Sequence, residues 1–163
     1  MKYKTGQFFY YNNNLVCIPY DESQTDYYTF LKKAYEKCYR RVRLLNDDMC
    51  DFLRYIYNNN LQSNKIECKG YDDELEEEIN AILKQVNANA TTLSSLLEHI
   101  GTHNAIIKRI YVQDNDQDGL DFFLHENGMF GVDKTHFDEV SENILTYLTA
   151  TKSSSQWQPG TSI

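Results

Sequence analysis

One segment of this 163-residue chain carries oxygen ligands at the spacing of a calcium loop. Residues Asp114 to Gly119 read Asp-Asn-Asp-Gln-Asp-Gly, which matches the first half of an EF-hand loop, with side-chain oxygens at positions 1, 3 and 5 and glycine at position 6. The second half departs from the pattern, because Asp121 stands at the usually aliphatic position 8 and His125 replaces the glutamate of position 12. We therefore interpret the segment as an acidic turn.

A second candidate metal site involves histidines. His99 and His103 are four residues apart, as two ligands on one helical face would be, and His125 and His136 could join them in space. Gly101 lies between the first two and indicates that the helix ends there, and no other Cys or His pair has a zinc spacing. We expect capping or surface histidines, with no metal and no cofactor.

Motifs for nucleophilic catalysis are missing from the sequence. It contains no Gly-x-Ser-x-Gly elbow, no glycine-rich phosphate loop and no Ser-x-x-Lys. Carboxylates between Glu74 and Glu78 could act as acid or base, but an acidic first helical turn is usually just solvated. We predict no catalytic residues and a protein that is not an enzyme; a small metal-dependent hydrolase using His99, His103 and the Asp114–Asp118 turn is a minor alternative.

Charge is sorted along the chain into two clusters. The basic cluster lies between Leu31 and Leu45, against the single acid Glu36, and comprises Lys32, Lys33, Lys37, Arg40, Arg41 and Arg43. The acidic cluster lies between Glu67 and Glu78, against the single base Lys69, and comprises Asp72, Asp73, Glu74, Glu76, Glu77 and Glu78. Two such clusters can pair internally, bind different partners, or join copies of the chain basic side to acidic side.

The overall charge narrows the choice of partner. A net charge of −8 and a pI near 4.9 argue against a protein that coats nucleic acid, so any such contact would have to use the basic cluster. Tyr28, Tyr35 and Tyr39 interleave with those cations, a mixture that suits phosphates and stacked bases. Alternatively, the tyrosines widen the buried face of a helix while the cationic heads stay in water. We favour a protein partner.

The elements that would position these residues begin with a hairpin and a long helix. Gln7–Tyr11 and Leu15–Ile18 are aromatic and β-branched runs joined by Asn12–Asn14, which predicts a β-hairpin. Apolar residues then recur at helical spacing from Ser23 to Leu45, which predicts one amphipathic helix with the basic cluster on its polar face.

Three more helices complete a helical middle. The second follows Asn46-Asp47 and buries Met49, Phe52, Leu53 and Ile56. The third has Asp72 as N-cap and buries apolar residues from Leu75 to Val86. The fourth runs from Thr91 or Thr92 to Gly101.

After the helical middle, the sequence pattern changes to that of β-strands followed by one helix. Ala105–Val112, Leu120–Leu124 and Met129–Val132 predict a three-stranded antiparallel meander, and Thr135-His136-Phe137-Asp138 has the capping-box spacing of a final helix. The expected fold class is α+β, as a single domain over residues 1–150. Residues 151–163 are expected to form an extended C-terminal arm or a disordered tail, with Trp157 as a partner-binding residue.

The apolar runs and cysteines give the expected compartment. The apolar runs are shorter than the roughly 20 residues that span a bilayer, and the first residues lack a signal-peptide apolar region. The four cysteines have scattered spacings, which indicates reduced thiols used as small core residues. We expect synthesis in the cytoplasm and no membrane contact.

Together these features predict a non-enzymatic assembly protein. Its partners would be other proteins, chiefly copies of itself in a ring or larger assembly, and its contact residues would be the basic cluster, the acidic cluster and Trp157. The most concrete form of this hypothesis is a small phage-like virion or head-tail connector ring component. The alternative is an acidic inhibitor or immunity-type protein whose Asp72–Glu78 surface masks a basic partner.

Overall fold

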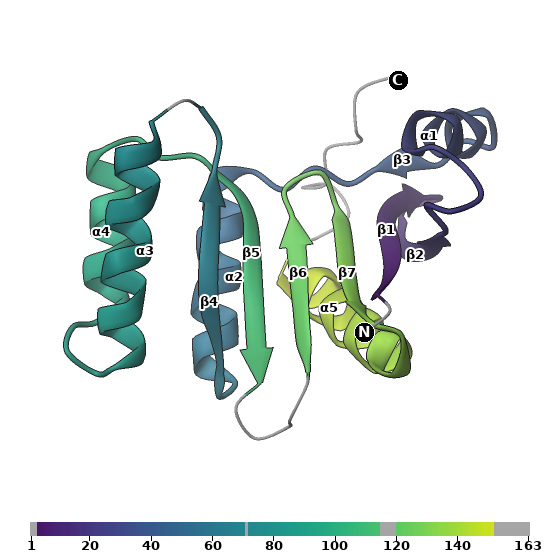
Figure 1. Ribbon diagram of the computed structural model, residues 1–163. Coiled ribbons are helices and arrows are strands. Elements are labelled where there is room, and N and C mark those ends of the chain that lie inside the picture. The colour runs from purple at the N-terminus through teal and green to yellow at the C-terminus, as the bar shows by residue number, and fades with distance from the viewer. Residues whose placement is uncertain (1–2, 71, 115–119, 152–163) are drawn as a thin grey trace. The chain divides into compact units, whose positions relative to one another are not determined.

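The computed structural model describes residues 3–70, 72–114 and 120–151 and divides the chain into two compact units (Figure 1). Unit 1 combines residues 1–43 with 127–163, and unit 2 comprises residues 44–126. The predicted α+β class is confirmed, because the described residues form five α-helices and seven strands with antiparallel pairing. The assignment of residues 1–150 to one domain stays a prediction.

The strands of unit 1 are built around the predicted N-terminal hairpin. Strands β1 (Tyr3–Tyr11) and β2 (Asn14–Tyr20) pair through a two-residue turn, in which Asn12 and Asn13 have φ angles of +49° and +64°. Two left-handed residues define a type I′ turn, whose twist matches that of the strands. Strand β7 (Met129–Asp133) pairs with the other edge of β1, and the short β3 (Arg40–Arg41) pairs with Phe9 and Tyr10 further along β1.

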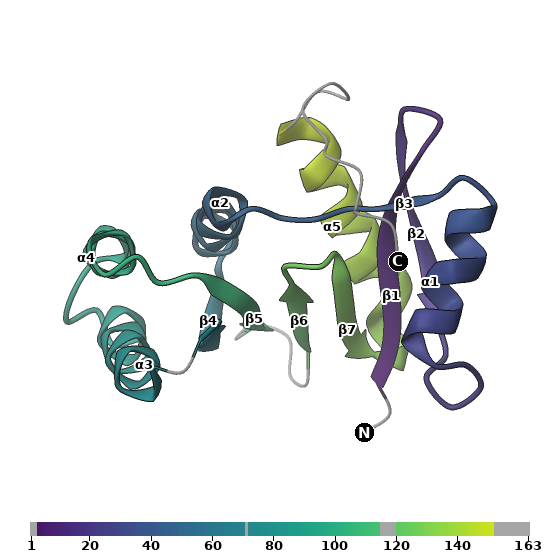
Figure 2. The same ribbon diagram turned by 90° about the horizontal axis from the view of Figure 1, so that it is seen from above.

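Two helices of unit 1 lie on opposite sides of β1 and β2 (Figure 2). Helix α1 (Tyr27–Glu36) is capped by Asp26, whose carboxylate accepts from the Thr29 N–H at 3.0 Å, and it packs Leu31 and Ala34 against Phe9. Helix α5 (Phe137–Thr151) follows a 3-10 turn, η1 (Lys134–His136), and stacks Phe137 on Phe130 with ring centroids 5.2 Å apart.

Helix α1 is much shorter than the sequence pattern predicts. The expected helix ran from Ser23 to Leu45, but α1 ends at Glu36 because Cys38 adopts a left-handed φ of +70° and the Tyr39 N–H turns back to the Ala34 carbonyl at 3.0 Å. The chain then becomes extended. The helical spacing of apolar residues beyond Glu36 therefore does not reflect a helix. Val42 is buried through its strand-like contact with β1, and Leu45 is 61% exposed.

Unit 2 contains three helices and three strands. The helices are α2 (Asn46–Asn58), α3 (Asp73–Asn87) and α4 (Leu93–Thr102). The strands are β4 (Leu61–Cys68), β5 (Ile107–Asp114) and β6 (Asp121–His125), paired in the order β4-β5-β6.

The helices of unit 2 agree with their sequence patterns. Met49, Phe52, Leu53 and Ile56 form the buried face of α2, and Asp72 caps α3 by accepting from the Leu75 N–H at 3.0 Å. Thr92 caps α4, which continues one residue beyond Gly101. Strand β4 was not predicted, because only Ser63 and Ile66 of its eight residues are buried and its polar residues hide any alternation.

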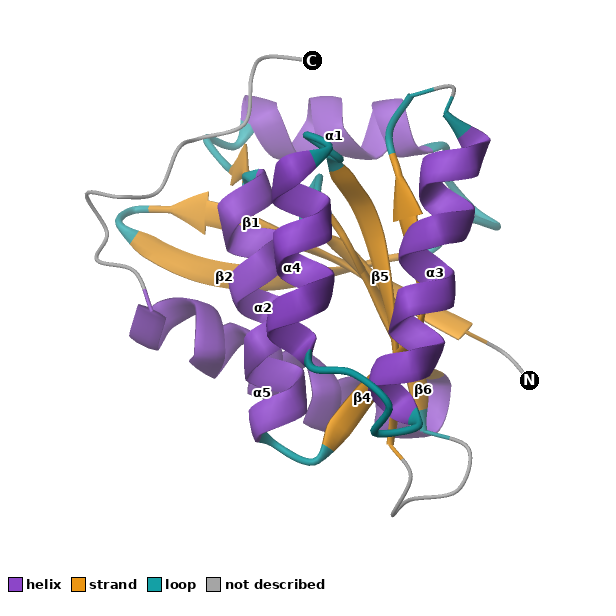
Figure 3. Cartoon of the chain, turned by 90° about the vertical axis from the view of Figure 1, so that its left-hand side faces the viewer, coloured by secondary structure: helices purple, strands orange, loops and turns teal. Residues whose placement is uncertain are grey.

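Helix α3 covers the outer edge of β4 (Figure 1). Its side chains bond the backbone of that edge: the Glu76 carboxylate accepts from the Cys68 N–H at 2.7 Å, Asn80 bonds Ile66, and the Asn87 amide donates to the Ser63 carbonyl at 2.7 Å. Figure 3 looks at this side of unit 2 and shows the three helices in front of β5. The edge is thereby closed to another strand.

The final helix begins differently from the predicted capping box. Thr135 and His136 lie in the 3-10 turn η1, and α5 starts at Phe137. Its buried residues are Phe137, Val140, Ile144 and Leu148, as expected, whereas Tyr147 is half-buried. Residues 152–163, which include Trp157 and nearly all of the predicted arm or tail, lie outside the described residues.

Candidate functional site

The basic cluster is spread over three local structures of unit 1 and does not form one helical face. Lys32 and Lys33 lie on α1 and Lys37 is its C-cap, and all three are exposed. Arg40 and Arg41 form β3 and Arg43 follows it, and these three are half-buried. Among the described residues, none of the six forms an ion pair with a carboxylate.

Two of the arginines make contacts within unit 1. The Arg40 guanidinium stacks on the Tyr35 ring, 3.7 Å from its centroid, and donates to the carbonyls of Tyr35 and Tyr39 at 3.2 and 2.9 Å. It thus places a cation at the C-terminal end of α1, where the helix dipole favours one. Burial raises the pKa of Tyr27, and a hydrogen bond from Arg41 opposes that rise.

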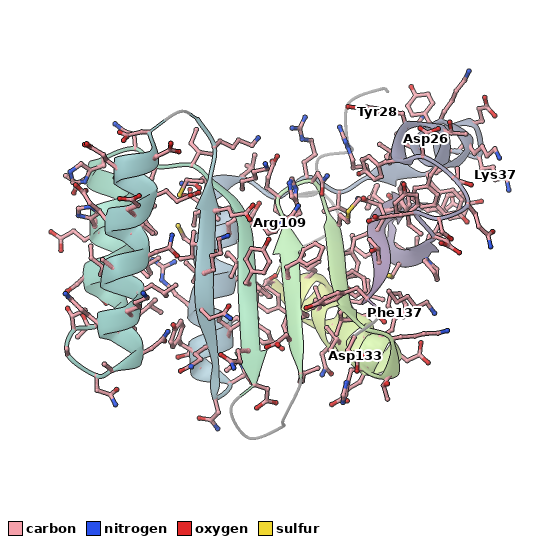
Figure 4. All side chains as sticks on the ribbon, viewed as in Figure 1. Asp26, Tyr28, Lys37, Arg109, Asp133 and Phe137 are labelled. Carbon is pink, nitrogen blue, oxygen red and sulfur yellow. The ribbon has the colours of Figure 1, made fainter. Side chains whose placement is uncertain are left out.

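The lysines Lys32, Lys33 and Lys37 are therefore the members of the cluster that remain in water; we call them the lysine face. Aromatic rings border it. Tyr28 is 73% exposed, and Tyr28, Lys32 and Tyr35 follow one another at intervals of four and three residues along α1. Tyr28 lies in the first turn of α1 and Lys37 is its C-cap, and Figure 4 shows their side chains pointing away from the helix on different sides. Tyrosine is enriched at protein-binding surfaces, although lysine is depleted there.

The acidic cluster, which lies in unit 2, also divides into residues that make local contacts and residues that are exposed. Asp72 caps α3, Glu76 bonds the edge of β4, and the Glu78 carboxylate lies 3.2 Å from His99 Nε2. The remaining members, Asp73, Glu74 and Glu77, are exposed and have no cation within ion-pair distance among the described residues; we call them the carboxylate face. Glu77 lies four residues after Asp73 and three after Glu74, so the three side chains share one side of α3.

The two units differ strongly in charge. Over the whole sequence, unit 1 contains 10 basic and 8 acidic residues, a net charge of +2, and unit 2 contains 6 basic and 16 acidic residues, a net charge of −10. These values sum to the −8 of the chain. The lysine face thus belongs to the positive unit and the carboxylate face to the negative unit.

The histidines make ordinary local contacts. The rings of His99 and His103 are 4.2 Å apart, and His103 Nδ1 lies 3.0 Å from the His99 carbonyl at the end of α4. His136 Nδ1 lies 3.1 Å from the Asp133 carboxylate in unit 1. Within residues 3–70, 72–114 and 120–151, no three His, Cys, Asp or Glu side chains gather as metal ligands. Of the calcium-like turn Asp114–Gly119, Asp114 is the last residue of β5 and residues 115–119 lie outside the described residues.

Sequence reasoning missed a network on β4, β5 and β6. Arg109 donates to the Tyr111 hydroxyl at 3.1 Å, and that hydroxyl donates to Glu67 Oε1 at 2.8 Å. The guanidinium also lies 4.6 Å from the Phe123 ring centroid. Glu67 and Arg109 are direct cross-strand partners, a relationship visible only once β4 is known to be a strand. The network holds strands together and does not extend either charged face.

The cysteines are all free thiols. Cys17, Cys50 and Cys68 are partly buried, whereas Cys38 is exposed beside the lysine face and is not the core residue that the sequence indicates. Burial raises the pKa of Cys17 to about 12 and that of Cys68 to about 11.

No protein family, curated protein or solved structure matches this chain. Among the helices described, none combines the length and the apolar character needed to cross a membrane.

Proposed function

We propose that this protein is a non-enzymatic assembly component that binds other proteins, chiefly copies of itself. The observation that supports the proposal is the presence of two oppositely charged faces, one in each unit, whose side chains form no ion pair with described residues of their own unit. The lysine face of one copy fits the carboxylate face of the next. Because the two faces differ, the contact is head-to-tail, and repetition of such a contact closes a ring or extends a filament.

The charged pairs alone would make this contact specific but would contribute little binding free energy. Exposed ion pairs contribute about 0.2–1 kcal/mol each, so three pairs supply only a few kcal/mol. Tyr28 and the Arg40–Tyr35 stack can add apolar contact beside the lysines. A contact of this kind weakens as salt screens the charges.

Within this proposal, the most concrete form is a small component of a phage-like particle, such as a virion protein or a head-tail connector ring. The abundance of Asn, Tyr, Lys and Ile, which have AT-rich codons, suits an AT-rich bacterium, its phage or a large virus. The charged faces support self-assembly, and the amino-acid composition supports a phage-like particle as the place where it occurs.

An acidic inhibitor or immunity-type protein is the second candidate function. It is favoured by the −10 net charge of unit 2 and by the exposed carboxylate face, which together would attract a basic partner. In that case the lysine face would be ordinary solvated surface.

The solution mass of the purified protein separates the two candidates. Light scattering at low salt should give a multiple of the 19.2 kDa chain mass, and that mass should fall as salt is added. A monomer at every concentration and salt would contradict self-assembly. A one-to-one complex with a co-purified basic protein would instead support the inhibitor.

A further inference from the structure

Strand β2 of unit 1 and strand β4 of unit 2 each have one edge that is paired with no described strand, and these two edges are very different. Strand β4 is covered by side chains of α3, whereas β2 has no strand or helix side chain bonded to its outer backbone within the described part of the chain. The half-exposure of Leu15, Val16, Cys17 and Ile18 agrees with this, since the neighbouring Phe8 and Phe9 of β1 are at most 1% exposed.

The hairpin register shows which groups of β2 point outward. A type I′ turn makes Tyr11 and Asn14 a hydrogen-bonded pair, so Phe9 with Val16 and Gln7 with Ile18 are also hydrogen-bonded pairs. The intervening residues of each strand then face away from the hairpin. On β1 this is confirmed, because the Phe8 N–H donates to the Gly128 carbonyl and the Phe8 carbonyl accepts from the Val42 N–H. On β2 the outward residues are Leu15, Cys17 and Pro19.

The outward backbone groups of β2 can form hydrogen bonds with the same groups of a second copy. Leu15 and Cys17 each offer an N–H and a C=O, whereas Pro19 offers only a C=O. If two β2 strands run antiparallel with Cys17 opposite Cys17, each Cys17 N–H meets the other Cys17 carbonyl and each Leu15 N–H meets the other Pro19 carbonyl. All four donors are satisfied. A register centred on Leu15 would bring Cys17 opposite the turn and lose those bonds.

Apart from Pro19, the edge lacks the usual protections against strand pairing. Residues 12–20 contain no charged side chain, and among the described residues β2 pairs with β1 without a bulge. Its two faces are occupied within unit 1, since Val16 and Ile18 pack on the α1 cluster and α5 contacts the strand. The groups left to bind a partner are therefore the backbone groups of the edge.

We propose that β2 is a self-pairing edge that joins two copies of the chain through an antiparallel β2–β2 contact centred on Cys17. The contact is isologous, with a two-fold axis through the Cys17 pair. It uses neither charged face, so it goes beyond the head-to-tail contact and survives if that contact is absent. A protein with both contacts would pair its rings or cross-link its filaments.

Residue-resolved hydrogen exchange tests the proposal. The measurement is made in about 1 M NaCl, where a Debye length near 3 Å suppresses the charged contact. At high protein concentration the Leu15 and Cys17 amides should exchange at least about tenfold more slowly than at high dilution. The Val16 and Ile18 amides are the internal control, because their bonds to β1 protect them at both concentrations.

Three results would overturn the self-pairing edge. Free exchange of Leu15 and Cys17 at every concentration would show that the edge stays open, and protection that persists in a monomer would show that the chain covers its own edge. A Cys17→Pro variant, which removes an outward donor, should be monomeric in high salt; a dimer of unchanged stability would also refute the contact. If that variant fails to fold, the exchange pattern of the unaltered protein still decides.

Discussion

The Asn80 carboxamide bonds both backbone groups of Ile66. Its Nδ2 donates to the Ile66 carbonyl at 2.9 Å, and its Oδ1 accepts from the Ile66 N–H at 2.9 Å. An amide side chain has the same donor and acceptor as a peptide group, so Asn80 takes the place of a residue in a neighbouring strand. The chain thus closes the outer edge of β4 with a helix, while no described residue forms a hydrogen bond to the outer edge of β2.

Replacing Asn80 with alanine should destabilise unit 2. The Asn80→Ala variant leaves the N–H and C=O of Ile66 without partners, and the expected loss is about 1–3 kcal/mol of unfolding free energy. Urea denaturation followed by circular dichroism measures it. The matched control is Gln85→Ala on the exposed side of α3, which should change stability by no more than about 0.5 kcal/mol. Equal effects of the two changes would show that Asn80 does not stabilise the edge.

Two glycines should respond to alanine in opposite directions. A Cβ on Gly6 would lie 2.5 Å from the Phe130 ring, so Gly6→Ala should destabilise the protein by about 1–3 kcal/mol. A Cβ on Gly101 meets nothing within 4 Å, so Gly101→Ala in α4 should stabilise it by up to about 1 kcal/mol. Thermal unfolding of both variants checks the pair, and a tolerated alanine at position 6 would contradict the packing of β1 on β7.

Stability should decline at alkaline pH because of the buried thiols. Burial raises the pKa of Cys17 to about 12 and that of Cys68 to about 11, against 9.0 in the unfolded chain. A raised folded-state pKa leaves stability intact below pH 9 and lowers it as pH rises toward 11 and 12, because the unfolded thiols ionise first. Denaturant midpoints between pH 8 and 11 measure the decline.

The control for this pH dependence removes the thiols of Cys17 and Cys68. Burial also raises the pKa of Cys50 and of Tyr20, Tyr27, Tyr55 and Tyr57, so some decline should remain in a Cys17→Ala, Cys68→Ala variant. The slope of stability against pH should nevertheless be shallower than in the unaltered protein. An unchanged slope would assign the whole effect to other groups.

Local sequence signals located most helices and strands. They missed the elements whose position depends on hydrogen bonds between residues far apart in the sequence. The hairpin turn at Asn12-Asn13 and the caps Asp72 and Thr92 were predictable, because turns and caps depend on neighbouring residues. The end of α1 was not, because Cys38 adopts the left-handed conformation that glycine usually provides. Strand β4 was missed because its edge is satisfied by Asn80 and Asn87, which lie 14 and 24 residues from their partners.

The candidate site was predicted in composition but not in shape. Sequence alone identified the basic and acidic clusters, because charge sorting needs no coordinates. It could not separate Arg40, which stacks on Tyr35, from the exposed Lys32, or Glu76, which bonds Cys68, from the exposed Glu77. Those distinctions can be made only once the positions of β3 and β4 are known. They reduce the twelve charged residues of the two clusters to two faces of three residues each.

Charge exchange between the two faces tests self-assembly most directly. One variant carries Lys32→Glu, Lys33→Glu and Lys37→Glu, and the other carries Asp73→Lys, Glu74→Lys and Glu77→Lys. Each variant alone has faces of like charge, so each should lose the salt-sensitive association of the unaltered protein. The melting temperature of each variant verifies that it is folded, since cations in the first turn of α3 cost some stability.

An equimolar mixture of the two variants gives the decisive result. Each reversed face then meets an oppositely charged face on the other variant, so sedimentation at low salt should show that the mixture regains the mass of the unaltered protein. If the separate variants keep that mass, or if the mixture remains as small as its components, the lysine and carboxylate faces do not join copies of this chain.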